Sequence, residues 1–127
     1  MADTTPMEIR YENHRSLATH LKALYTEINK LAMKKPADPI TPLISRKINH
    51  VIVRVKQQVG GDEFLDAIET MPVEGQLNRY DEVLIVTAEL RSAMDRQWAS
   101  EEYSDYREKL GFLPILRGRS YESQTIG

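Results

Sequence analysis

Arg46, Lys47, His50 and Arg54 follow one another at spacings of one, three and four residues. An α-helix turns by about 100° per residue and gathers these side chains within roughly a quarter to a third of its circumference. They belong to segment 41–59, which contains no acidic residue. Such a surface can bind anionic groups, either carboxylates of a protein partner or phosphates of a nucleic acid. These four residues are therefore a candidate binding face.

Acidic residues suggest a second kind of chemistry. Glu63 and Asp66 are three positions apart, and so are Glu102 and Asp105. Two such pairs on facing helices hold Mg²⁺ in all-α nucleotide pyrophosphohydrolases, because a hard cation prefers several carboxylate oxygens. Acidic residues are so frequent between positions 62 and 108 that such pairs also arise by chance. A magnesium-dependent enzyme of this kind is an alternative interpretation, and we assign no metal ligand.

Other enzyme chemistries lack their usual residues. The chain has no cysteine, which excludes disulfides, thiolate zinc sites and cysteine nucleophiles. The histidines do not have zinc-binding spacing, since His14 and His20 fall on opposed sides of a helix and His50 is distant in sequence. No Gly-x-Ser-x-Gly, Walker or dinucleotide-binding glycine motif occurs. We therefore predict no catalytic residue and no cofactor.

The C-terminal part of the chain contains a second candidate binding segment. Leu113, Ile115 and Leu116 are apolar, and Pro114 prevents them from continuing a helix. We expect this segment to lie extended over a groove. It would pack on its own bundle, on a second copy or on another protein.

The clearest helical pattern precedes the first group of prolines. Apolar residues recur there at spacings of four, three, four and three: Leu17, Leu21, Leu24, Ile28 and Leu31. Thr5 and Pro6 form a typical helix start, and Pro36, Pro39 and Pro42 make the segment after Lys34 a stiff connector. The pattern predicts a helix that ends near Lys34.

Segment 41–59 is predicted to be the next long helix. Thr41 and Pro42 are a cap followed by proline, and Gly60 and Gly61 would stop the helix. The β-branched run 51–55 is also compatible with a strand. The length of the apolar pattern and the caps favour the helix.

Three further helices are expected in the second half of the chain. A short one follows Asp62, a long one covers 78–98, and the last begins after Ser100. In the long helix, Ile85 points almost opposite to Val83. We therefore expect the start of this helix to be buried on two sides, either inside the bundle or in a dimer interface.

Together these patterns predict an all-α antiparallel bundle of four to five helices. We expect a single helical domain over residues 1–111, followed by a partly mobile C-terminal extension over 112–127. The absence of a secretory pattern and of a membrane-spanning segment leads us to expect a cytoplasmic protein with no membrane partner.

The net charge of −2 is unevenly distributed along the chain. Residues 27–61 carry +5, whereas residues 62–108 carry −9. Such asymmetry is typical of interaction proteins, although the two blocks would also attract each other within one bundle. We predict a non-catalytic interaction or adaptor protein that forms a homo-oligomer or binds a protein partner. Nucleic-acid binding through helix 41–59 is the alternative; the pI of about 5.9 does not favour it.

Overall fold

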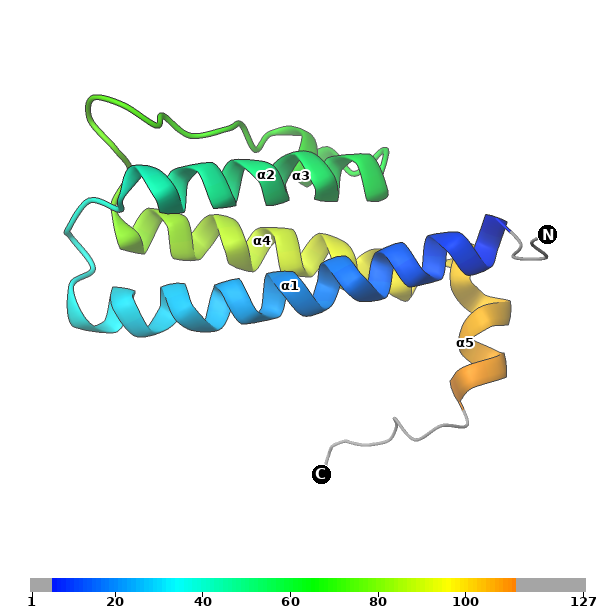
Figure 1. Ribbon diagram of the computed structural model, residues 1–127. Coiled ribbons are helices and arrows are strands. Elements are labelled where there is room, and N and C mark those ends of the chain that lie inside the picture. The colour runs from blue at the N-terminus through cyan, green and yellow to red at the C-terminus, as the bar shows by residue number, and fades with distance from the viewer. Residues whose placement is uncertain (1–5, 112–127) are drawn as a thin grey trace. The chain divides into compact units, whose positions relative to one another are not determined.

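The computed structural model describes residues 6–111 and consists of helices joined by loops (Figure 1). The elements are α1 (Pro6–Lys34), α2 (Pro42–Gln58), α3 (Glu63–Asp66), α4 (Tyr80–Trp98), the 3₁₀ helix η1 (Glu101–Tyr103) and α5 (Ser104–Gly111). Within the described range no strand forms, and Pro39 and Arg79 make only an isolated bridge. The predicted all-α bundle is therefore confirmed.

The chain divides into two compact units after Met94, within α4. In the first unit, α1 runs opposite to α2 and α4, while α2 and α4 run in the same direction (Figure 1). The segment between α3 and α4 makes this arrangement possible, because it leads the chain back along α2. The predicted domain over 1–111 and extension over 112–127 stay predictions, and residues 112–127 lie outside the described range.

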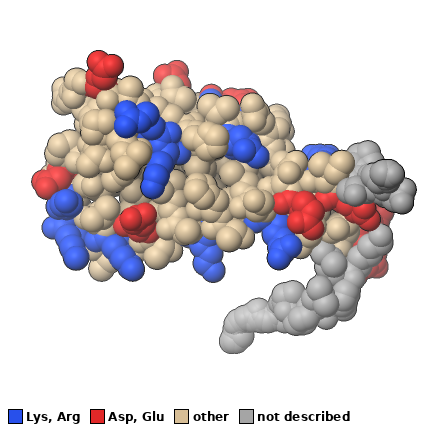
Figure 2. Space-filling view, in the orientation of Figure 1, with Lys and Arg blue, Asp and Glu red and all other residues tan. Residues whose placement is uncertain are grey.

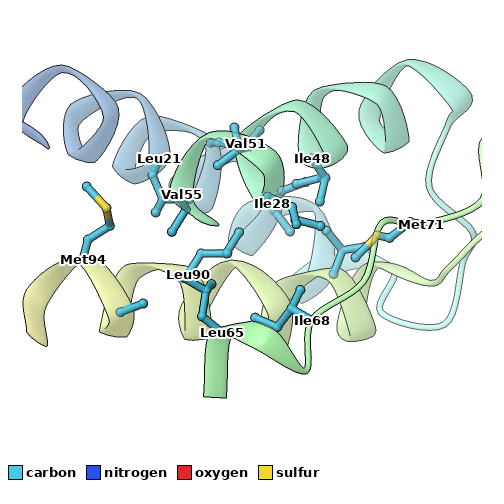
Figure 3. Close-up of a cluster of buried hydrophobic side chains, with 14 of the residues drawn as sticks. Leu21, Ile28, Ile48, Val51, Val55, Leu65, Ile68, Met71, Leu90 and Met94 are labelled. Atoms are coloured by element: carbon cyan, nitrogen blue, oxygen red, sulfur yellow. The ribbon is translucent and has the colours of Figure 1, made fainter. Parts of the chain in front are cut away.

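The core of the first unit is aliphatic and combines α1, α2 and α4 (Figure 3). The largest apolar side chains that are fully buried in it are Leu21, Ile28, Ile48, Val51, Ile52, Val55, Leu65, Val83, Leu90 and Met94. Full burial of one such side chain contributes about 1.5–3 kcal/mol. The apolar residues of α1 that formed the predicted helical pattern are thus packed in the core of the same chain.

The burial pattern of α2 excludes the strand alternative for segment 51–55. Val51, Ile52 and Val55 are buried, whereas Val53 is 45% exposed. A strand would place Val51, Val53 and Val55 on the same face. The predicted caps are present as well: the Thr41 hydroxyl accepts a hydrogen bond from the Ile44 amide at 3.2 Å, and Gly61 adopts a positive φ of 78°. Hence the helix forms as its caps and length indicate.

Asp62 begins α3 as predicted. One of its carboxylate oxygens accepts hydrogen bonds from the amides of Phe64 and Leu65, at 3.0 and 3.1 Å. This cap turns the chain directly after the end of α2, and the short helix buries Leu65 in the core.

The return segment, residues 67–79 between α3 and α4, is held in place by hydrogen bonds of its backbone groups. The side-chain amide of Asn49 donates to the Met71 carbonyl at 2.8 Å, and its carbonyl accepts from the Met71 amide at 2.6 Å. Further along, the Ile40 amide donates to Asn78 and the Tyr80 amide donates to Asp38. These contacts attach the segment to α2 and to the α1–α2 connection.

Of the two alternatives for the start of α4, burial on two sides inside the bundle is wrong. Val83 is buried, but Ile85 is 61% exposed, because its position on the helix points away from the core. A dimer interface at Ile85 stays a prediction.

The second unit is described over residues 95–111. Trp98 and Tyr103 pack edge to face with ring centroids 5.6 Å apart, and the Arg107 guanidinium donates to the carbonyls of Trp98 and Ser100. The predicted last helix is present as α5, but its first turn, η1, is a 3₁₀ helix.

Replacing Asn49 with alanine is expected to lower the free energy of unfolding by about 1–3 kcal/mol, because two backbone groups of Met71 lose their partners. Urea denaturation measures this. The control is Asn13→Ala, an exposed asparagine in α1 with the same change in helix propensity. Its effect should stay within about 0.5 kcal/mol. Equal effects of the two substitutions would contradict the role given to Asn49.

Candidate functional site

Helix α2 has one side in the core and the opposite side in solvent. Its buried line is Ile48, Val51, Ile52 and Val55. The helical period therefore turns Arg46, Lys47, His50 and Arg54 outward, and all four side chains are exposed. We call these four residues the basic face. In the space-filling view of Figure 2, basic side chains stand among uncharged ones where α2 lies in Figure 1.

The basic face has no charge partner within residues 6–111. None of its four side chains makes an ion pair or a hydrogen bond to another described residue. The acidic residues of the first unit, between positions 62 and 94, therefore do not pair with this face. The charge distribution along the sequence did not show whether the acidic residues neutralise the basic face. Within the first unit they do not.

Several other basic residues do have partners. Arg15 lies 3.7 Å from Glu12, and Arg79 lies 3.1 Å from Asp81. The hydrogen bond to Asp81 raises the pKa of the Arg79 guanidinium. Arg91 stacks over the Tyr25 ring at 4.7 Å from its centroid. The exposed cations of the basic face differ from these, since no described residue compensates their charge.

Two apolar side chains share the solvent side of α2 with the basic face. Leu43 is 55% exposed and Val53 is 45% exposed. Val53 lies two turns after Arg46, and the separation of ten positions between Leu43 and Val53 corresponds to about 15 Å along the helix. The surface thus combines charge with apolar contact area. Sequence reasoning missed this, although a helical wheel would have placed Val53 beside Arg46.

A hollow of about 280 Å³ lies where α1 and α2 run side by side, lined by Ser16, Leu17, His20, His50 and Arg54. A hydrogen bond of 3.2 Å from the Gln58 side chain to the Arg10 carbonyl links the two helices in addition to their shared core. Antiparallel helices in this register bring His20 near His50, thirty residues apart in sequence. The histidine spacing alone gave no sign of this cluster.

The remaining predicted residues are the acidic pairs of the magnesium alternative and the apolar residues of the tail. Glu63 and Asp66 belong to the first unit, whereas Glu102 and Asp105 belong to the second. Between residues 6 and 111, no three His, Asp or Glu side chains are grouped so that they could hold a metal ion. The magnesium alternative stays a prediction. The apolar tail residues Leu113, Ile115 and Leu116 lie outside the described residues.

Comparison of the chain with protein-family models, curated proteins and solved structures finds no match. The fold and the surface define the class only: an all-α protein with an exposed basic helix face. None of the helices between residues 6 and 111 combines the length and the apolar character that a membrane span requires.

Substitution of the basic face is expected to leave the fold intact. Arg46→Ala, Lys47→Ala and Arg54→Ala should each change the free energy of unfolding by less than about 0.5 kcal/mol, because these side chains are exposed and unpaired among the described residues. Ile48→Ala, on the opposite side of α2, should cost about 2–5 kcal/mol. Chemical denaturation compares the four variants, and a large loss from any basic-face variant would show that the charge serves the fold.

Proposed function

We propose that this protein is a non-catalytic interaction protein that binds an acidic protein partner through the basic face of α2. The observation that carries the proposal is the exposure of Arg46, Lys47, His50 and Arg54 without a charge partner among the described residues. The face sits on a helix whose other side is anchored in the core, so little ordering is needed on binding.

A protein partner fits this surface better than a nucleic acid does. Leu43 and Val53 add apolar contact area next to the charges, as interfaces between proteins do. Helix α2 contains no Phe, Tyr or Trp on which a base could stack. The net charge of −2 and the pI of about 5.9 also oppose general attraction to a polyanion.

The expected partner presents carboxylates flanking a few apolar side chains, for example on an amphipathic helix. Exposed charge pairs contribute only about 0.2–1 kcal/mol each. The charges would therefore act mainly on the association rate and on the choice of partner, while Leu43 and Val53 supply apolar contact. The interaction should accordingly weaken as salt increases.

The proposal is tested with a synthetic helical peptide that carries glutamates around a leucine stripe, and with a glutamine version of the same peptide. The acidic peptide should bind, and it should bind more weakly in 0.5 M than in 0.05 M NaCl. The double substitution Arg46→Glu/Arg54→Glu should weaken binding at least about tenfold, equivalent to about 1.4 kcal/mol. Fluorescence anisotropy measures each affinity.

The matched control is Lys22→Glu/Lys30→Glu, which changes the net charge equally at two exposed positions of α1. It should weaken binding no more than about twofold, because screening limits the effect of distant charges. Equal losses in the two double variants, or equal binding of the glutamine peptide, would refute recognition by the basic face. Tighter binding of a short DNA duplex, lost in Arg46→Glu/Arg54→Glu, would instead support the nucleic-acid alternative.

A further inference from the structure

We infer that the hollow between α1 and α2 binds a phosphoryl group, carried by a side chain of the partner that docks on the basic face. This inference rests on the proposed function and adds the chemistry of the group that the partner presents. Two of the lining residues, His50 and Arg54, belong to the basic face, whereas Ser16 and His20 come from α1. The hollow therefore lies at the edge of the proposed docking surface.

The lining supplies hydrogen-bond donors from two helices. Arg54 has a permanently charged guanidinium with five N–H donors, and each imidazole offers at least one N–H. The Ser16 hydroxyl adds a further donor. Leu17 is 8% exposed and contributes an apolar wall. No acidic residue lines the hollow, so an incoming anion meets no carboxylate there.

A phosphoryl group uses this set of donors more fully than a carboxylate does. A carboxylate has two oxygens, and a single guanidinium can satisfy both in a bidentate pair. A phosphorylated side chain presents three strong acceptor oxygens and a charge of about −1.5 to −2. Arg54, His20, His50 and Ser16 approach from two helices and can serve separate oxygens. The volume of about 280 Å³ is slightly below the range of about 300–1,000 Å³ that is typical of ligand pockets, which suits one small group.

The donors are free to bind an external group. Ser16, His20, His50 and Arg54 make no hydrogen bond or ion pair with another residue of the described range. Their backbone is held by the packing of Leu17, Leu21, Val51 and Val55 and by the hydrogen bond between Gln58 and Arg10. The site is thus preorganised at the level of the two helices.

The inference is tested by titrating the full-length protein with inorganic phosphate and following amide and imidazole chemical shifts. The largest changes should occur at residues 16, 20, 50 and 54. His20→Ala should weaken phosphate binding at least fivefold, and His20→Asn, which keeps a donor, should restore part of the affinity. Lys47→Ala is the matched control, because Lys47 is an exposed cation of the basic face that does not line the hollow. It should weaken binding no more than twofold.

A second arm identifies the source of the phosphoryl group. N-acetyl-O-phosphoserine should bind the same residues, more tightly than N-acetylglutamate, and should lose this advantage in His20→Ala. Equal effects of His20→Ala and Lys47→Ala would overturn the phosphoryl site and leave the acidic-partner proposal intact. Binding of inorganic phosphate but not of N-acetyl-O-phosphoserine would overturn the assignment to a partner side chain. Phosphate binding at the hollow without any binding of the acidic peptide would refute the proposed function instead.

Discussion

The packing of α2 against α1 is the interaction on which the rest of the first unit depends. Ile48, Val51 and Val55 enter the same aliphatic core as Leu21 and Ile28. Because a helix repeats every 3.6 residues, burying this line leaves only one direction for the charged residues of α2. The exposure of the basic face is thus a direct consequence of core formation. The hollow with His20 and His50 follows from the same contact, since it forms where the two helix surfaces adjoin.

The shared direction of α2 and α4 imposes a second constraint, since the chain must travel back along α2 between them (Figure 1). The return segment has little regular secondary structure, so its backbone N–H and C=O groups need hydrogen-bond partners outside the segment. Asn49 provides them by pairing with both the amide and the carbonyl of Met71. One polar side chain on α2 therefore fixes the position of a segment that also buries Ile68 and Met71. One side of α2 packs in the core, a second side holds the return segment through Asn49, and a third side forms the exposed basic face.

Local sequence signals predicted most of the fold, and long-range contacts explain the rest. Caps and prolines at Thr41, Pro42 and Lys34–Pro36 placed the ends of the first two helices, since capping is a local property. Periodicity also identified the side of α2 that bears charge. It did not reveal whether the acidic residues cover that side, nor that Ile85 is exposed, because both depend on the arrangement of helices. The cluster of His20 and His50 was invisible for the same reason: it depends on the register between two helices.

The charge arrangement of α2 is unfavourable for the isolated helix. This cost suggests that the charges serve a purpose other than folding. Arg46, Lys47 and Arg54 place three positive charges on one side of this helix, and the helix contains no acidic residue to offset them. No acidic residue occupies the first turn, where a carboxylate would stabilise the helix dipole. Within residues 6–111 no carboxylate pairs with the basic face to offset these costs. An anionic partner that docks on the basic face would supply the missing compensation.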